Sequence, residues 1–217
     1  MWCIGELTPE YIERMEDVLN LYEKSYSQEE PVVCFDERPV QLLEDGRSGL
    51  PAKPGAVAKQ DYEYIRCGTC NVFCGVEPKA GRHFTKVTKN RKGPAFAKVI
   101  EQVSRRYPDT ETIHLVLDNL NTHREKSLTD YYGQKRGHEI WDRFTIHYTP
   151  KHGSWLNQAE IEIGLFSKQC IGKDRIGNRR ELRKRAVAWN RSVNRKKIKI
   201  DWTFTTKKAQ ETFKYER

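Results

Sequence analysis

Hydrophobic residues recur along the chain in two patterns, and each pattern predicts one kind of element. Apolar positions three and four residues apart are typical of a helix with one buried face. On this basis helices are predicted over 8–24, 95–103, 122–135, 154–171 and 179–199. Runs rich in β-branched and aromatic residues predict strands over 32–36, 61–76, 82–89, 113–118 and 144–148. The order β, β-hairpin, α, β, α, β, α indicates an α/β fold with a mixed five-stranded sheet flanked by helices.

The polar loop and the sequence's lack of a membrane span or secretory signal indicate the compartment in which the protein is expected. Residues 46–59 are rich in Gly, Pro and Ser and predict an exposed loop without regular structure. No apolar run approaches the ~18 residues that a membrane-spanning helix needs. The first 20 residues carry five acidic side chains and lack the apolar core of a secretory signal. We therefore expect a cytoplasmic protein with no membrane partner, whose six cysteines stay reduced.

Positive charge is concentrated in one segment of the chain. The 217 residues carry a net charge of +9, yet residues 168–199 alone hold thirteen Lys or Arg against two acidic residues. Such asymmetry is typical of a protein that binds a polyanion, with a solvated helix face as the alternative. The predicted helix 179–199 has an apolar side and a basic side suited to DNA phosphates. The basic residues predicted to contact DNA are Arg179, Arg180, Arg183, Lys184 and Arg185.

Two of the predicted strands run directly into an aspartate, at Asp36 and at Asp118. A carboxylate at the end of a buried strand is costly unless it binds a cation, accepts hydrogen bonds or caps a turn. A third acid nearby would favour the cation. In the helix predicted over 154–171, Glu160 and Glu162 flank the apolar stripe on opposite sides. Periodicity alone does not choose between these two glutamates.

Three segments around these acids resemble the signature blocks of a known family, the DDE transposases. The segments are Cys34-Phe35-Asp36-Glu37, Leu117-Asp118-Asn119-Leu120-Asn121-Thr122-His123 and Tyr148-Thr149-Pro150-Lys151-His152-Gly153-Ser154-Trp155-Leu156-Asn157-Gln158-Ala159-Glu160. Residues 201–206 near the end also resemble this family. Over nearly its whole length, the chain is similar to the mariner-related bacterial insertion-sequence group, the insertion sequence 630 group.

The resemblance implies a ribonuclease H-like fold in which the first and fourth strands lie side by side. It further implies that Asp36, Asp118 and Glu160 are the catalytic acids and the ligands of Mg²⁺ or Mn²⁺, with two ions in the site. Glu162 is then left outside the catalytic set. Hard divalent cations prefer oxygen ligands, which suits three carboxylates.

Other residues of the matching blocks have two possible roles. Asn119 and His123 either orient the acids or pack the turn after the strand, and Asn157 is expected to support the acids. Glu37 is expected to point to the opposite sheet face and to be structural. Separately, the cysteines Cys67, Cys70 and Cys74, with His83, allow either a zinc site or buried thiols.

The resemblance also implies an activity, partners and a domain organisation. We expect metal-dependent cleavage and strand transfer of double-stranded DNA, both transposon ends and target, by a homodimer at the bacterial nucleoid. Residues 1–30 are interpreted as an accessory helix, 31–172 as the catalytic domain and 173–217 as a basic helical tail. The segment before the catalytic domain has no room for the helix-turn-helix modules usual in the family. The alternatives are a ribonuclease H-like nuclease without strand transfer and a truncated, non-catalytic regulator that binds DNA.

Overall fold

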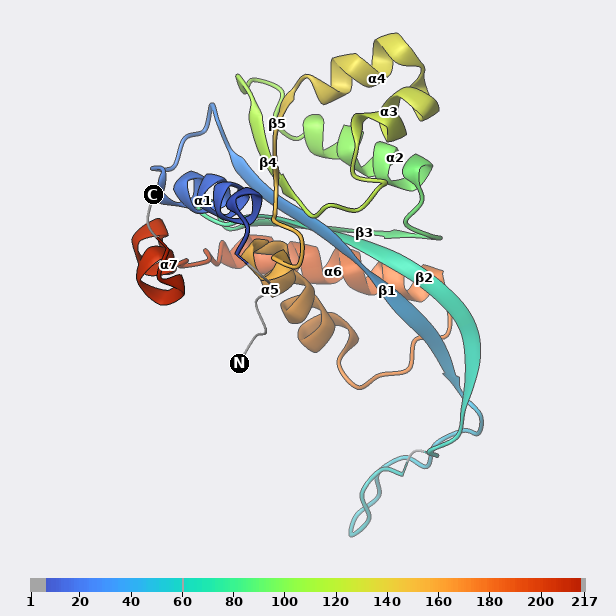
Figure 1. Ribbon diagram of the computed structural model, residues 1–217. Helices are drawn as coiled ribbons and strands as arrows, with labels where there is room; N and C mark the ends of the chain where they lie inside the picture. Colours follow the sequence, from blue (N-terminus) through green and yellow to red (C-terminus); the bar gives the residue numbers. More distant parts are fainter. Residues whose placement is uncertain (1–6, 60, 216–217) are drawn as a thin grey trace.

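Five strands form one mixed sheet in the computed structural model, which describes residues 7–59 and 61–215. The strands are β1 Val32–Asp45, β2 Tyr64–Glu77, β3 Arg82–Thr88, β4 Ile113–Leu117 and β5 Phe144–Tyr148. They lie in the order β3-β2-β1-β4-β5 (Figure 1). The β1–β2 and β2–β3 pairs are antiparallel, whereas β1–β4 and β4–β5 are parallel. The predicted mixed α/β sheet is therefore confirmed; residues 1–6 of the predicted N-terminal segment lie outside the described residues.

Helices cover both faces of this sheet. They are α1 Pro9–Glu23, α2 Gly93–Ser104, α3 Glu125–Tyr132, α4 Gln134–Trp141, α5 Ala159–Phe166, α6 Arg179–Lys196 and α7 Thr206–Phe213. Helices α2, α3 and α4 lie on one face and α5 and α6 on the other, with α1 and α7 together at one end (Figure 1). Across residues 7–59 and 61–215, none of the helices combines the length and the apolar character of a membrane span.

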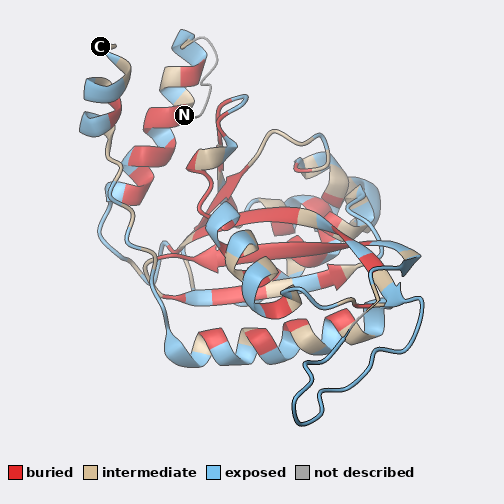
Figure 2. Ribbon diagram, turned by 90° about the horizontal axis from the view of Figure 1, so that it is seen from below, coloured by how far each residue is buried: buried red, intermediate tan, exposed pale blue. Residues whose placement is uncertain are grey.

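The central strands are buried on both faces because their apolar residues alternate between two cores (Figure 2). On the α2 face the ring of Phe35 stacks on Phe73, with centroids 5.5 Å apart, and meets Phe96 edge-on at 6.0 Å. On the other face Cys34 and Val116 join the core formed with α1 and the start of α5. This two-sided burial fixes the register of β1 and hence the position of its acidic residues.

Two predicted helices differ from the observed ones. The helix predicted over 122–135 is split into α3 and α4 at Gly133, whose positive φ of 83° a helix interior does not allow. The helix predicted from Ser154 begins as a 3₁₀ turn, Ser154–Leu156, and α5 starts only at Ala159. A π-helical segment, Ser167–Ile171, then ends it. The interruption before α5 matters because it involves Asn157, which belongs to the candidate site.

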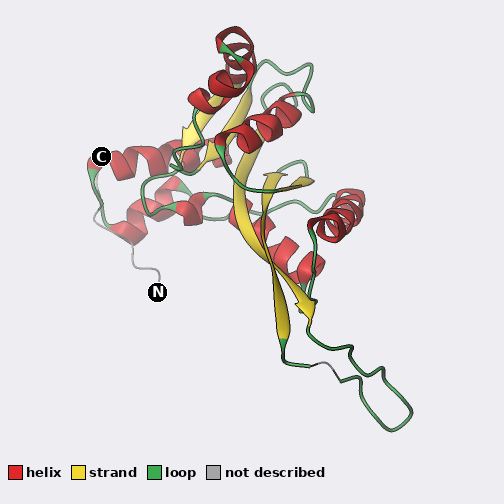
Figure 3. Cartoon of the chain, turned by 90° about the vertical axis from the view of Figure 1, so that its right-hand side faces the viewer, coloured by secondary structure: helices red, strands yellow, loops and turns green. Residues whose placement is uncertain are grey.

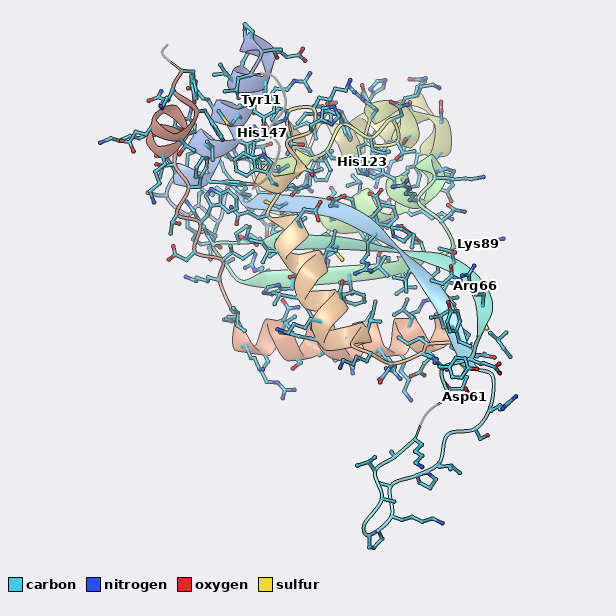
Figure 4. The ribbon with its side chains drawn as sticks, turned by 60° about the horizontal axis from the view of Figure 1, so that its bottom comes forward. Tyr11, Asp61, Arg66, Lys89, His123 and His147 are labelled. Atoms are coloured by element: carbon cyan, nitrogen blue, oxygen red, sulfur yellow. The ribbon has the colours of Figure 1, made fainter. Side chains whose placement is uncertain are left out.

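Strand β1 is much longer than the predicted 32–36 and forms, with β2, an arm that extends beyond the rest of the sheet (Figure 3). Arg66 and Asp61 lie along this arm in Figure 4. The loop predicted over 46–59 is exposed throughout and contains only isolated β-bridges. The prediction ended the strand too early because polar residues follow Asp36, but these residues alternate with Val40 and Leu42, which are buried.

Helix α1, whose first turn Thr8 caps as predicted, is attached to the sheet through a chain of polar groups. Asp17 Oδ2 lies 2.7 Å from His147 Nδ1, and His147 Nε2 lies 2.9 Å from His114 Nδ1. Burial lowers the pKa of His114, and the neighbouring His147 and Lys24 lower it further. The neutral form of His114 is therefore favoured in the folded protein.

This pairing predicts a pH dependence of stability. A group whose pKa is lowered by folding stabilises the protein above its unfolded pKa, about 6.5 for histidine, and loses that contribution as the pH falls. We expect His114→Asn to reduce the loss of the free energy of unfolding between about pH 7.5 and pH 5.5, measured by urea denaturation. The exposed His152, whose positive φ of 65° asparagine tolerates, provides the control His152→Asn. Equal pH profiles for His114→Asn and the unaltered chain would contradict the assignment.

Candidate active site

Parallel pairing of β1 with β4 brings two of the predicted acids together. Cys34 pairs with Val116, so that Asp36 and Asp118 follow two residues later in neighbouring strands that run the same way. Since side chains two residues apart lie on the same face of a strand, both carboxylates lie side by side near the end of β4, on the face that carries Cys34 and Val116. Asp36 is buried, whereas Asp118 directly follows the end of β4 and is partly exposed.

Asn157 attaches the helix of the third acid to this part of the sheet. Its side chain is fully buried, and its Nδ2 donates to the carbonyl of Phe35 at 2.9 Å, next to Asp36. Its Oδ1 accepts from the backbone N–H of Ala159 at 3.1 Å and so caps the start of α5. Glu160 lies in the first turn of that helix. One amide side chain thus joins the start of α5, which carries Glu160, to the backbone of β1 next to Asp36.

The three carboxylates share one electrostatic environment. Burial raises the pKa of Asp36 to about 7, and repulsion from Asp118, Glu37 and Glu160 contributes. Burial and Asp118 likewise raise the pKa of Glu160. Carboxylates that raise one another's pKa in this way hold negative charge that a bound cation would offset.

His123 orients Asp118 and is itself held by a second acid. Its Nδ1 donates to Asp118 Oδ1 at 2.6 Å, and its Nε2 lies 2.9 Å from Glu37 Oε2, an ion pair without ideal hydrogen-bond direction. Although burial opposes protonation, these two acids raise the pKa of His123 to about 9. The ring stacks on Phe96 of α2 with centroids 4.7 Å apart and is labelled in Figure 4. His123 is therefore a buried cation between two carboxylates.

Glu37 lies on the opposite sheet face from Asp36, as predicted, but it supports the site. Its Oε1 accepts from Arg91 Nη1 at 3.2 Å, while its other oxygen faces His123. Burial opposes ionisation of Asp118, yet the hydrogen bond from His123 holds the pKa of Asp118 below its usual value. Sequence reasoning missed this role because the contact depends on a histidine 86 positions further along the chain.

Asn119 makes a different set of contacts. Its side-chain oxygen accepts from Arg14 Nη1 of α1 at 2.7 Å, and its amide nitrogen donates to the carbonyl of Thr149 after β5. These bonds join the end of β4 to α1 and β5. Asn119 thus packs the turn after the strand, whereas His123 contacts a catalytic candidate directly.

The structure distinguishes Glu160 from Glu162. Glu162 is completely buried and pairs with His83 of β3, with Oε2 and Nδ1 2.7 Å apart. The other ring nitrogen of His83 lies 3.1 Å from the carbonyl of Ile198. Glu162 therefore joins α5, β3 and the segment after α6, while Glu160 is left exposed in the first turn of α5.

The chemistry of the three carboxylates fits a divalent cation, which takes hard oxygen ligands. As the side chains of residues 7–59 and 61–215 stand, however, no three acidic, His or Cys groups are close enough to hold a metal ion. A cation would have to draw Asp36, Asp118 and Glu160 closer together. Repulsion between uncompensated charges gives a physical reason for their separation.

The cysteines of β2 are separate from this site. Cys70 and Cys74 are buried in the core beneath α5 and α6, and Cys67 is half-buried. Burial raises the pKa of each of these thiols. His83, the fourth ligand considered with them, is instead paired with Glu162.

The basic residues predicted to bind DNA lie on α6, which runs beside β3 at the sheet edge opposite β5 (Figure 1). Arg179, Arg180, Arg183 and Lys184 are exposed. Arg185 is half-buried and pairs with Asp174 at 2.6 Å and with Glu181 at 2.9 Å. Four of the five predicted cations are thus open to a ligand, and the fifth is paired within the chain.

A mixed sheet of this strand order, with Asp36 in β1 and Asp118 after the adjacent parallel strand β4, is a ribonuclease H-like fold. The chain belongs to the DDE superfamily endonucleases, because the model of that family matches residues 31–183. No curated protein sequence matches the chain.

Solved structures agree with this fold at low sequence identity. The Mos1 mariner paired end complex with Mn superposes with a TM-score of 0.59 at 13% identity. The matched region covers 91% of the present chain and 61% of the Mos1 chain. The Mos1 strand transfer complex gives a TM-score of 0.58 at 12% identity, covering 91% of this chain and 62% of its own. The present chain therefore spans about three fifths of the length of these transposase chains.

Because Glu162 is buried and paired whereas Glu160 is exposed, replacing each by Gln should affect the melting temperature differently. Removing one partner of a buried ion pair typically costs about 3 kcal/mol or more. We expect Glu162→Gln to lower the melting temperature by roughly 6–12 °C. Glu160→Gln, which relieves repulsion at an exposed position, should leave it unchanged or raise it slightly. Circular dichroism melts compare the two variants, and equal destabilisation would contradict the assignment.

Proposed function

We propose that this chain is the catalytic domain of a DNA transposase of the mariner-related bacterial insertion-sequence group. The observation that supports this most directly is the parallel pairing of β1 with β4, which brings Asp36 and Asp118 onto neighbouring strands of a DDE superfamily endonuclease. Repulsion from neighbouring acids raises the pKa of Asp36 and of Glu160, and a cost of this kind favours a catalytic reason for the arrangement. The mariner structures support the same function by likeness of fold.

Asp36, Asp118 and Glu160 are the residues that would hold Mg²⁺ or Mn²⁺, with two ions as the family resemblance implies. Bound there, divalent ions activate the attacking oxygen and stabilise the leaving oxygen of a phosphodiester. The mariner structures of similar fold include complexes with Mn and with Mg.

The surrounding residues prepare these acids. His123 keeps Asp118 ionised and engages its Oδ1, so that Oδ2 is directed elsewhere. Glu37 and Arg91 in turn keep His123 in place. Such support of a metal ligand typically changes activity or metal affinity by 10–100-fold when it is removed, roughly 1–3 kcal/mol.

Two reactions follow from one such site. In the first, water attacks a phosphodiester at a transposon end, the bond from phosphorus to the 3′ oxygen breaks, and a 3′-hydroxyl is released. In the second, that hydroxyl attacks a phosphorus of target DNA and displaces the target's 3′ oxygen. In both steps Asp36, Asp118 and Glu160 would hold the divalent ions, whose positive charge would position the reacting phosphate.

The partners follow from the reaction. The substrate is double-stranded DNA, as transposon ends and as target, in the bacterial cytoplasm at the nucleoid. Two ends must be brought together before they are joined to a target, which favours a homodimer. The paired-end arrangement named for the Mos1 mariner structures is consistent with this proposal.

A cleavage assay tests the proposal. The purified chain is incubated with supercoiled plasmid in Mg²⁺ or Mn²⁺, and nicked and joined products are followed on gels. We expect Asp118→Asn to lower nicking by at least about a hundredfold, because a ligand matters at least as much as its supporting residues. Asp130→Asn makes the same change at an exposed position on α3 and should leave nicking unchanged. EDTA should abolish the activity.

The products separate the alternatives. Joined substrate and target strands would support a transposase, whereas metal-dependent nicking without joining would identify a ribonuclease H-like nuclease instead. DNA binding without any cleavage that depends on Asp118 would overturn the enzymatic proposal and indicate a regulator that binds DNA.

A further inference from the structure

A basic groove lies at the β3 edge of the sheet, away from the three acids. It has a volume of about 320 Å³ and lies between α2 on one face and α6 on the other. Figure 1 shows these helices on opposite sides of β3. Thr85 of β3 pairs with Cys74 of β2, and Cys74 pairs with Asp36 of β1. Strand β2 therefore lies between the groove and Asp36.

Four cations from three different elements line this groove, and no acidic residue does. They are Lys86 of β3, Arg106 just after α2, and Arg183 and Arg191 of α6. All four are exposed, and none forms an ion pair with another residue of the described chain. The guanidinium of Arg106 lies over the ring of Phe84, 5.0 Å from its centroid, which holds the charge at the groove wall.

The α6 side of the groove is part of a regular row. Arg183, Val187 and Arg191 are four residues apart and therefore share one helix face, advancing about 6 Å at each step. Arg179 and Arg195 extend the same row at its two ends. Arg180 and Lys184 are equally exposed but do not line the groove. The groove thus distinguishes basic residues that the sequence treats alike.

The β3 edge itself is not open to another strand. Asn194 accepts from the backbone N–H of His83 at 2.9 Å and donates to its carbonyl at 2.7 Å. Asn190, one turn earlier on α6, donates to the Thr85 hydroxyl at 2.9 Å. Two asparagines therefore occupy the outward polar groups that an added strand would use. A ligand of this groove must be recognised by the charged side chains instead.

We propose that this groove binds the phosphate backbone of duplex DNA outside the catalytic site. Clustered Lys and Arg without intervening acids match a polyanion, and guanidinium groups pair with phosphate oxygens in bidentate geometry. The inference rests on the proposed function only in taking DNA as the polyanion. It requires no cleavage, and it assigns Lys86 and Arg106 a role that the sequence interpretation did not give them.

Binding of a labelled 30-base-pair duplex in EDTA tests the groove without any cleavage. Fluorescence anisotropy at several salt concentrations gives the affinity and its salt slope, which changes by about 0.9 per phosphate contact. We expect Arg183→Gln/Arg191→Gln to flatten the slope by about two units and to weaken binding roughly tenfold or more. Lys86→Gln/Arg106→Gln should have a similar effect, although these residues lie outside α6.

Matched variants remove the same kind of charge outside the groove. Lys126→Gln/Arg136→Gln removes two exposed cations of α3 and α4 that are paired with Asp130 and Glu139, and Arg105→Gln removes a cation that is paired with Glu101 at 2.9 Å. Both should keep the salt slope within about half a unit of the unaltered chain. Circular dichroism confirms folding of each variant.

Three outcomes would overturn the proposal. Equal losses in groove and matched variants would indicate general attraction rather than a groove, and an unchanged slope in the groove variants would show that DNA does not bind there. Displacement of the duplex by poly-glutamate at equal charge concentration would indicate an acidic protein partner instead. The binding assay in EDTA does not depend on cleavage. A plasmid assay that shows no Asp118-dependent cleavage would therefore overturn the proposed enzymatic function without overturning the proposed DNA-binding groove.

Discussion

Repulsion between three carboxylates is the constraint on which the rest of the structure depends. Asp36 lies in β1, Asp118 directly follows β4 and Glu160 lies in α5. Asp118 and Glu160 raise the pKa of Asp36, and Asp118 raises the pKa of Glu160. Like charges in a partly buried site separate unless the backbone around them is rigid. Parallel pairing of β1 with β4 provides that rigidity, because both strands are buried on both faces and a shift in register would expose their apolar side chains.

The two faces of the sheet support the acids by different means. On the α5 face a neutral amide, Asn157, fixes the start of the helix to β1 by two hydrogen bonds. On the α2 face the buried cation His123 lies between Asp118 and Glu37, and Arg91 adds a second positive charge. Asp118 and Glu37 therefore share a positive partner, which burial in low dielectric requires. The acids lie where the two supports meet.

Local patterns predicted the sheet well, and contacts distant in sequence decided the site. The ends of β4 and β5 follow from apolar runs, and the approach of Asp36 and Asp118 follows from the resemblance. Periodicity could not separate Glu160 from Glu162, because the difference is the partner His83, 79 residues away. The role of Glu37 was missed for the same reason. Residue type and spacing determine elements, whereas partners across the fold determine which charged groups are buried and paired.

Charge is divided in space as well as along the chain. The acids of the candidate site lie on the central strands β1 and β4, whereas the groove cations without acidic partners gather at the edge strand β3, on the far side of β2. A polyanion is repelled by these acids until cations neutralise them, since only Asp118 has a positive partner in the described part of the chain, so attraction must come from elsewhere on the surface. Because the basic row lies at the β3 edge of the same sheet, the proposed DNA contact would not weaken the acids proposed to bind metal by direct ion pairing. Had Arg183 or Arg191 lain beside Asp118, they would have competed with a divalent ion for its carboxylate.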